Sequence, residues 1–217
     1  MTTQLIPATI ETYACDYSSE ESNVLAQLNR ETHLKVNLPI MLSGHLQGKV
    51  LEFISHMIQP MHVLEVGTYT GYSAICLAAG LKENGVLHTI DINEELYDMC
   101  QSYFEKAGLS KKIIQHIGHA ADIIPRIDCI FDLVFIDADK QNYHLYYDLV
   151  IDRLPIGAYI LADNVLYDGE VLLEQEKQSK NAKAIQAFNE KIKADHRVIQ
   201  VLLPIRDGLL LMKKISD

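Results

Sequence analysis

From residue 61 onward the chain alternates short apolar runs with longer amphipathic segments, and this alternation limits the fold more than any other feature. Several runs are apolar at every position, as expected of strands buried on both faces, and helices between them imply a parallel sheet covered on both sides. The last two runs are joined only by Arg206 and Asp207 before Gly208, so they must form an antiparallel hairpin. The chain is therefore predicted to form a doubly wound α/β fold whose seven-stranded sheet is mostly parallel, with an antiparallel last strand. The predicted strands are 61–66, 85–90, 111–117, 131–136, 157–162, 197–203 and 209–215, and the predicted helices between them are 73–81, 94–106, 142–154 and 182–193.

Residues 1–58 show no strand pattern. Apolar residues with helical spacing predict one helix within 18–35, where the Ser-Ser-Glu-Glu start is typical of a helix N-terminus, and a second over 43–58. The second helix is expected to bury one broad face, which consists of Leu46, Val50, Leu51, Phe53, Ile54 and Met57. We therefore predict a single domain over residues 1–217, in which a helical layer (1–58) precedes the Rossmann-like core (61–215).

Composition narrows the class of protein further. The 217 residues are 48% apolar and carry 19 basic and 29 acidic side chains, a net charge of −10 that disfavours binding to nucleic acid or to an anionic membrane. Four scattered cysteines favour a reduced compartment over a disulfide scaffold. The start has no signal-peptide pattern and no apolar run reaches membrane-spanning length. A cytoplasmic protein is the expectation.

The first strand runs into a glycine-rich turn, Val63-Leu-Glu-Val-Gly-Thr-Tyr-Thr-Gly-Tyr-Ser73, where a doubly wound fold places its ligand loop. Tyr69 stands where a dinucleotide-binding turn needs its middle glycine, which argues against that ligand. Glu65 would repel a phosphate but could hold a cation, and Asp91, which ends the second strand, could bind a ribose diol. Two such carboxylates suit S-adenosylmethionine, a sulfonium with a ribose and an amino-acid tail.

An acidic cluster follows the next two strands. Asp137, Asp139 and Lys140 come directly after one strand, and Asp163 and Asn164 after the other, so all should meet at the edge where the glycine-rich turn lies. Oxygen ligands from Asp137, Asp163 and Asn164 suit Mg²⁺ or Ca²⁺ and argue against zinc. Near such a cation, Lys140 would be pushed toward its neutral form and could act as a general base.

These residues are sufficient for transfer of a methyl group to a hydroxyl. That reaction needs the sulfonium and the oxygen held in line at contact distance, together with help for the oxygen to lose its proton. A divalent ion that binds the oxygen promotes this loss and orients the substrate.

At these motifs the chain resembles the cation-dependent O-methyltransferases of the caffeoyl-CoA O-methyltransferase family, with catechol O-methyltransferase a more distant relative. The resemblance runs from about Pro39 to Ile215. It is carried by the 63–73 turn, by Phe131-Asp-Leu-Val-Phe-Ile-Asp-Ala-Asp-Lys-Gln-Asn-Tyr143, by Ala162-Asp-Asn164 and by Leu203-Pro-Ile-Arg-Asp-Gly208.

The resemblance implies a role for each matching residue. It implies metal ligation by Asp137, Asp163 and Asn164, with Mg²⁺ or another divalent cation such as Ca²⁺ or Mn²⁺, and it implies Lys140 as the base. The S-adenosylmethionine contacts that it implies are Ser43, Glu65, Gly67, Thr68, Ser73, Asp91, Ala120 and Asp139. Members of the family are commonly dimers, so a homodimer is expected.

The chain also departs from the plant members of this family. It has Tyr167-Asp168 where they have Trp-Asn, its 39–48 stretch looks like bacterial members, and it contains no tryptophan. These departures disfavour a coenzyme A thioester as substrate. A free catechol or another small vicinal diol fits better, with Tyr167 forming a wall beside its ring.

Other functions remain open. Bacterial relatives with a similar fold methylate a hydroxylated uridine in transfer RNA. The net charge and the lack of a basic segment disfavour this activity for the present chain. A dinucleotide-dependent dehydrogenase conflicts with Tyr69, and a non-enzymatic binding module conflicts with the intact acidic cluster and Lys140. The polar 174–183 segment is expected to be a solvated loop and helix start, with a lid over the site as the alternative.

Overall fold

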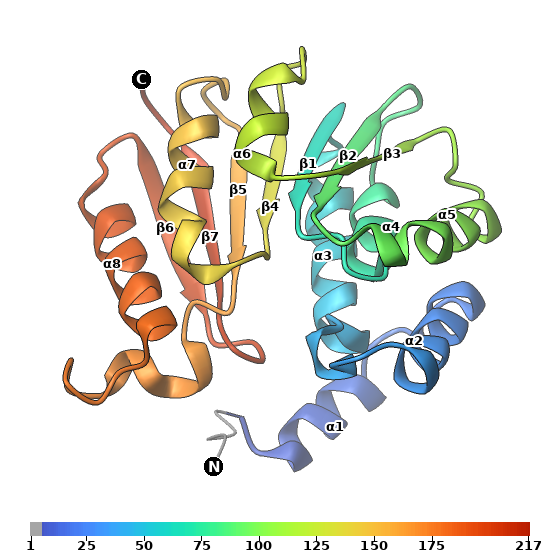
Figure 1. Cartoon of the computed structure of the whole chain (residues 1–217), viewed down its shortest axis with the longest axis horizontal. Helices are drawn as coiled ribbons and strands as arrows, with labels where there is room; N and C mark the ends of the chain where they lie inside the picture. The colour runs from blue at the N-terminus through green and yellow to red at the C-terminus, as the bar shows by residue number, and fades with distance from the viewer. Residues whose placement is uncertain (1–5) are drawn as a thin grey trace.

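The computed structural model describes residues 6–217, which form one seven-stranded sheet with helices on both faces (Figure 1). The strands follow one another across the sheet in the order β3-β2-β1-β4-β5-β7-β6. Their bounds are β1 His62–Val66, β2 Val86–Asp91, β3 Ile113–Ile117, β4 Leu133–Ile136, β5 Tyr159–Asp163, β6 Val198–Leu203 and β7 Leu209–Lys214. Each lies within or next to the range predicted from the apolar runs.

The pairing directions confirm the predicted topology. Strands β1 to β5 pair in parallel, whereas β7 pairs antiparallel with both β5 and β6. Strand β4 shows why a uniformly apolar run marks a central strand, because all four of its residues are buried, with one neighbour on each side and helices on both faces.

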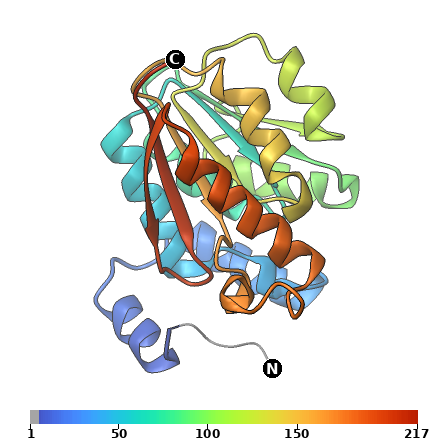
Figure 2. The ribbon, with the colours of Figure 1, turned by 90° about the vertical axis from the view of Figure 1, so that its left-hand side faces the viewer.

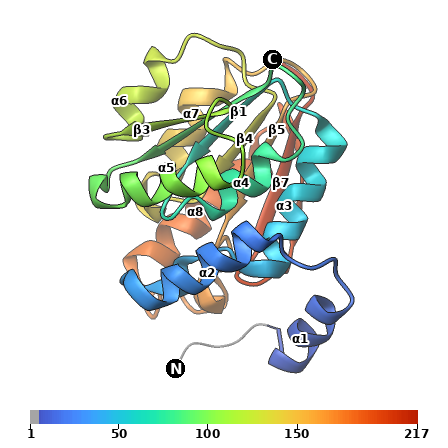
Figure 3. The same ribbon diagram turned by 90° about the vertical axis from the view of Figure 1, so that its right-hand side faces the viewer.

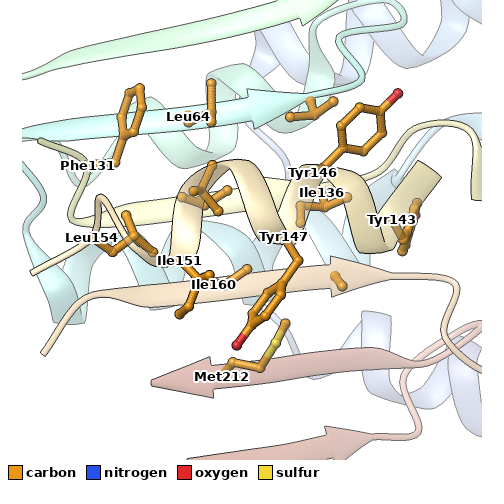
Figure 4. Close-up of a cluster of buried hydrophobic side chains, with 14 of the residues drawn as sticks. Leu64, Phe131, Ile136, Tyr143, Tyr146, Tyr147, Ile151, Leu154, Ile160 and Met212 are labelled. Carbon is orange, nitrogen blue, oxygen red and sulfur yellow. The ribbon is translucent and has the colours of Figure 1, made fainter. Parts of the chain in front are cut away.

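Two separate clusters of buried side chains hold the layers together. One cluster joins the sheet to α6, α7 and α8, and the other joins the opposite face to α2, α3, α4 and α5. Figure 2 shows α3 and α8 on opposite sides of the sheet, and Figure 3 shows α2, α4 and α5 together on one side. In the first cluster three tyrosines of α7 pack over the strands (Figure 4); they are Tyr143, Tyr146 and Tyr147.

The helices agree with the predicted ranges in most places. Their bounds are α1 Ala8–Asp16, α2 Asn23–Lys35, α3 Gly44–Ile58, α4 Tyr72–Ala78, α5 Tyr97–Lys106, α6 Ala120–Ile123, α7 Tyr143–Ile151 and α8 Lys180–Ala194. Five short 3₁₀ segments connect them: η1 Pro39–Met41, η2 Glu94–Leu96, η3 Ile124–Arg126, η4 Lys140–Asn142 and η5 Tyr167–Leu172. Helices α1 and α6 were not expected. Helix α1 has no buried residue, so it leaves no apolar periodicity, and α6 is a single turn.

Two expectations about the N-terminal helices need correction. Helix α2 begins after Ser22, whose side chain accepts a hydrogen bond from the main-chain N–H of Leu25, and not at the Ser-Ser-Glu-Glu segment. Helix α3 buries a narrower face than predicted, since Phe53 and Met57 are 62% and 74% exposed. Its buried residues are Gln47, Gly48, Leu51, Ile54 and Ser55, so a polar amide lies on the face that packs inward.

Within residues 6–217 no helix is long and apolar enough to cross a membrane. The carboxyl ends of the parallel strands β1, β2, β4 and β5 open at one edge of the sheet, as the shared directions require. All of the predicted site residues that follow these strands lie along that edge.

Candidate active site

The turn after β1 is shaped by its contact with the end of β4. Gly67 has φ 105°, and a Cβ atom built on it would lie 1.8 Å from the main-chain oxygen of Asp137. No side chain fits there, so glycine is required for the two strand ends to approach each other. The approach brings the turn and Asp137 to the same cavity.

Asp91 closes this turn from the end of β2. Its Oδ2 accepts the main-chain N–H groups of Thr68 (3.0 Å) and Tyr69 (2.7 Å), and its Oδ1 accepts that of Asn93 at 2.8 Å. Tyr69 has φ 47°, an uncommon conformation for a bulky residue, which the carboxylate stabilises through this bond. Tyr69 also donates through its hydroxyl to the main-chain oxygen of Asn37 and so ties the 36–38 segment to the turn.

Glu65 lies beneath the turn and is fully buried. Its Oε2 accepts a hydrogen bond from the hydroxyl of Thr89 at 2.5 Å, whereas its Oε1 has no hydrogen-bond partner among residues 6–217. Burial, with smaller contributions from the negative charges of Asp137 and Asp91, raises the pKa of this carboxyl to about 8. A cationic group bound above the turn would favour the ionised form.

Lys140 is the centre of the cluster at the ends of β4 and β5. Its Nζ donates to Oδ1 of Asp137 at 2.9 Å, to Oδ1 of Asn164 at 2.7 Å and to the hydroxyl of Tyr143 at 2.7 Å. The Tyr143 hydroxyl in turn donates to the main-chain oxygen of Asp163. Lys140 is thus in direct contact with two other residues predicted from sequence, Asp137 and Asn164. Tyr143 also accepts a hydrogen bond from the lysine.

Asp163 is buried at the end of β5, and its two oxygens differ. Oδ2 accepts a hydrogen bond from Nε2 of Gln47 at 2.7 Å, whereas Oδ1 is buried and finds no hydrogen-bond partner in the part of the chain that the structure describes. Burial raises the pKa of this carboxyl to about 7, and the nearby charge of Asp137 acts in the same direction. A buried carboxylate oxygen without a partner is costly unless a cation or a donor binds it.

Two adjoining cavities open along this edge, one of about 770 Å³ over β4 and β5 and one of about 910 Å³ over β1, β2 and β3. The residues that line both are Met41, Gly67, Tyr69, Asp137, Ala138 and Asp139. The first cavity also contains the predicted residues Ser43, Thr68, Ser73, Lys140, Asp163, Asn164 and Tyr167. The second contains Asp91 and Ala120, while Glu65 lies below both.

Asp139 faces both cavities, but its oxygens bond within its own region. Its Oδ1 accepts from the hydroxyl of Tyr146 at 2.5 Å, and its Oδ2 accepts from the amide of Asn142. A ligand that binds Asp139 would share it with these two groups.

The backbone is strained around the first cavity. Of the seven non-glycine residues with positive φ in the described part of the chain, five line it: Tyr69, Asn164, Tyr167, Asp168 and Arg206. Such conformations cost free energy and cluster at functional sites. At Asn164 the cost is small, because asparagine tolerates this region, and the turn directs its side chain to Lys140.

Tyr167 lines the first cavity and is held from α8. Its hydroxyl accepts a hydrogen bond from the amide of Asn181 at 2.8 Å, and Asn181 also accepts one from Gln141 at 3.1 Å. The 174–183 segment therefore ends in a helix start that contributes Asn181 to the cavity. Whether this segment moves as a lid stays a prediction.

Several residues of the site were not singled out from sequence. Arg206, Asp207, Asn181 and Gln141 line the first cavity, and Gln47 contacts Asp163. One signal was available for Gln47, since it is a single amide on the apolar face of an amphipathic helix. Arg206 and Asp207 lie within the 203–208 motif, but they reach the site only because β7 returns antiparallel beside β5.

The donor set fits a hard divalent cation. Asp137, Asp163 and Asn164 all line one cavity and offer oxygen atoms, and Oδ1 of Asp163 has no partner within the described chain. No group of three His, Cys, Asp or Glu side chains within residues 6–217 is arranged to hold a metal. The candidate set differs from such a group because its third member is an amide, whose oxygen here accepts from Lys140.

Comparison with known proteins identifies the family. A family model described as O-methyltransferase matches residues 15–215. The chain belongs to this O-methyltransferase family. It is 32% identical over 200 residues to a caffeoyl-CoA O-methyltransferase from Petroselinum crispum, which covers 86% of this chain and 82% of the relative.

Solved structures of similar proteins share the fold over nearly the whole chain. An O-methyltransferase from Streptomyces achromogenes involved in tomaymycin synthesis, solved in complex with SAM, superimposes with a TM-score of 0.88 at 26% identity and covers 96% of each chain. The O-methyltransferase from Bacillus cereus, solved in complex with SAH, has a TM-score of 0.86 at 29% identity and covers 95% of this chain and 97% of its own. The predicted family and fold are therefore both confirmed.

Proposed function

We propose that this chain transfers the methyl group of S-adenosylmethionine to a hydroxyl of a small catechol-like vicinal diol, with the help of a divalent cation. The observation that carries the proposal is the buried cluster of Asp137, Lys140, Asp163 and Asn164 in a cavity that adjoins a second one of sufficient size for a nucleoside.

The two adjoining cavities suit the two ends of the methyl donor. In the second cavity Asp91 would bind the ribose diol, and Ala120 would lie beside the adenine. Ser43, Gly67, Thr68, Ser73 and Asp139 would hold the amino-acid end nearer the first cavity, and the negative charge of Glu65 beneath the turn would favour a sulfonium. Similar chains were solved with SAM or SAH bound, which supports this ligand.

The metal would be held by Asp137, Asp163 and Asn164. When bound, such an ion promotes loss of the hydroxyl proton and orients a diol through its two oxygens. The partnerless Oδ1 of Asp163 supports a cation at this place, because an ionised oxygen buried without a partner otherwise destabilises the fold. Mg²⁺ fits the all-oxygen donors, as do Ca²⁺ and Mn²⁺.

Lys140 would accept the proton. Its Nζ already lies between Asp137, Asn164 and Tyr143, so a hydroxyl bound at the same place is within reach of the amine. In the reaction the substrate oxygen forms a bond to the methyl carbon, and the bond from that carbon to sulfur breaks. The hydroxyl proton moves to Nζ of Lys140, which must be in the neutral amine form that a nearby cation favours.

The charges of the first cavity favour a small substrate over a coenzyme A thioester. Among the described residues the cations that line it are Lys140 and Arg206, and both are already engaged in hydrogen bonds. Glu11, Asp168 and Asp207 add negative charge to the same cavity, which would repel the phosphates of coenzyme A. Tyr167 would lie beside the ring of the diol.

The test is transfer of methyl-labelled S-adenosylmethionine to a panel of catechols, with Mg²⁺ and with a chelator. Transfer that stops on chelation and returns on addition of Mg²⁺ is expected, and Lys140→Met should lower kcat by about 10²- to 10⁴-fold. Transfer that ignores the chelator would refute the metal role. If the label enters transfer RNA and none of the diols, the substrate is a nucleic acid and the proposed substrate class is wrong.

We also propose that the chain forms a homodimer. Strand β6 lies at the edge of the sheet and exposes Ile199 and Val201, which are 55% and 52% exposed. An exposed apolar edge strand favours association with another chain. Light scattering coupled to size-exclusion chromatography should give twice the mass of 24.5 kDa, and a mass of one chain would refute the dimer.

A further inference from the structure

Helix α3 directs one amide into the core beneath the first cavity. Gln47 is only 1% exposed. It lies on the buried face of the helix with Gly48, Leu51 and Ile54, none of which has a polar side chain. Burial of a primary amide is favourable only when its polar atoms find partners. Its Nε2 finds Oδ2 of Asp163, 2.7 Å away and 116 positions along the chain.

Arg206 satisfies the other end of this amide. From the turn between β6 and β7, its Nη1 donates to Oε1 of Gln47 at 3.1 Å. The oxygen and nitrogen of a glutamine amide can exchange places by a rotation of 180°. A guanidinium can only donate hydrogen bonds, so the amide oxygen of Gln47 faces Arg206. The NH₂ group of the same amide therefore faces Asp163.

The same guanidinium holds the wall of the cavity. Its Nη1 also donates to the main-chain oxygens of Leu42 (2.8 Å) and Ser43, and its Nη2 donates to that of Ile40 at 3.4 Å. Figures 2 and 3 show the end of the β6–β7 hairpin beside the N-terminal end of α3. Arg206 itself has φ 49°, a strained conformation that these contacts maintain.

The consequence for Asp163 is a fixed orientation. Its Oδ2 is held by Gln47, its main-chain oxygen accepts a hydrogen bond from Tyr143, and its Oδ1 at the cavity has no partner among the described residues. A carboxylate that ligates a metal through one oxygen is commonly oriented by a donor on the other. The Arg206–Gln47 pair has this relation to Asp163.

We propose that Gln47 and Arg206 are positioning residues for the metal-dependent reaction: Arg206 fixes the amide of Gln47, and Gln47 holds the Asp163 carboxylate so that Oδ1 is presented to the cation. The inference rests on the proposed function, since it concerns the same metal site. A residue with a merely structural role would change stability without changing the affinity for the metal.

The test measures Mn²⁺ binding by the cofactor-free protein, from the electron paramagnetic resonance signal of free Mn²⁺. Gln47→Met keeps the length of the side chain and removes the donor, so the dissociation constant for Mn²⁺ should rise about 10- to 100-fold. The affinity for S-adenosylmethionine, measured by calorimetry, should stay within about 3-fold of wild type. Thermal unfolding of each variant shows that it is folded.

Ser55→Ala is the matched control. Ser55 is also buried on α3, and its hydroxyl donates to the main-chain oxygen of Leu77, so the variant loses one buried hydrogen bond away from the cavity. It should lower the unfolding temperature and leave Mn²⁺ affinity unchanged. If Gln47→Met binds Mn²⁺ as wild type does, the proposal is wrong.

Arg206→Met provides an independent variant that leaves the amide of Gln47 free to rotate. It should weaken Mn²⁺ binding about 10-fold. Because Arg206 also holds Leu42 and Ser43, it should weaken S-adenosylmethionine binding as well, which Gln47→Met should not.

The double variant shows whether the two residues act as one unit. With Gln47 already replaced, removal of Arg206 should cause little further loss of Mn²⁺ affinity, since residues that act through one another are not additive. Fully additive losses would overturn the role of Arg206. If wild type and Asp163→Ala bind Mn²⁺ equally weakly, the proposed metal site itself fails, and this outcome is distinct from the failure of Gln47 alone.

Discussion

The two halves of the ligand-binding edge use their carboxylates in different ways. At the ends of β1 and β2, both carboxylate oxygens of Asp91 accept hydrogen bonds from main-chain N–H groups, and these bonds hold the shape of a loop. At the ends of β4 and β5, Asp137, Asp163 and Asn164 bond to other side chains, and Oδ1 of Asp163 bonds to nothing within the described residues. The carboxylate of the first half is engaged by the backbone of a loop, whereas those of the second half lie among other side chains at the first cavity.

Glu65 and Asp163 sharpen this contrast. Both are buried carboxyl groups in which, within residues 6–217, one oxygen has a hydrogen-bond partner and the other has none, and burial raises the pKa of both. Asp163 lines the first cavity, whereas Glu65 is covered by the turn above it. A ligand in the first cavity could therefore contact Asp163 directly, whereas Glu65 lies outside the lining of both cavities.

The largest expected effect is a loss of turnover without a loss of cofactor binding, and it concerns the half at the ends of β4 and β5. Asp163→Ala should lower turnover by more than about 100-fold, because removal of a proposed metal ligand should weaken metal binding more than removal of a residue that only orients that ligand. Binding of S-adenosylmethionine, measured by calorimetry, should remain close to wild type. Asp152→Ala, which removes an exposed acid, serves as the control. Loss of cofactor binding with retention of metal binding would show that the two halves are wrongly assigned.

An intermediate effect is expected in the other half. Asp91→Ala removes the acceptor of three main-chain N–H groups and the proposed ribose contact. Affinity for S-adenosylmethionine should fall about 10- to 100-fold and the free energy of unfolding by about 1–3 kcal/mol. Mn²⁺ affinity of the cofactor-free variant should be unchanged, and a parallel loss of Mn²⁺ binding would contradict the division.

The smallest effect concerns pH. The pKa of Glu65 is raised from 4.5 to about 8, so the folded protein keeps a proton that the unfolded chain releases between these values. Folding therefore becomes less favourable as pH rises through that window. Glu65→Gln cannot ionise and should flatten this dependence by about 1.4 kcal/mol for each pH unit between pH 5 and 7. Asp163 acts in the same direction and remains in both proteins.

Urea unfolding of the cofactor-free protein at several pH values measures this difference. An identical slope for wild type and Glu65→Gln would mean that Glu65 is ionised in the folded state at pH 5. Addition of S-adenosylmethionine should reduce the difference, since a bound sulfonium favours the carboxylate.

Much of the site was predictable because parallel strands bring their carboxyl ends to one edge. Once β1, β2, β4 and β5 were recognised as apolar runs, the four carboxyl groups at or just after their carboxyl ends had to lie at that edge; they are Glu65, Asp91, Asp137 and Asp163. Their roles toward a cofactor or metal stay predictions. Gln47 and Arg206 were not singled out, because the contacts that matter to them span 116 and 159 positions and depend on how α3 and the β6–β7 turn pack.

The sequence by itself determined the order and type of the strands and of the helices other than α1 and α6, since strand and helix leave different apolar periods in the chain. It also determined where the charged residues stand relative to the strand ends. Only the tertiary structure decided which oxygen of each carboxylate is free, because that depends on donors from distant segments. The same packing decided that Phe53 and Met57 face outward while Gln47 faces inward, since a helix buries the side that its neighbours cover.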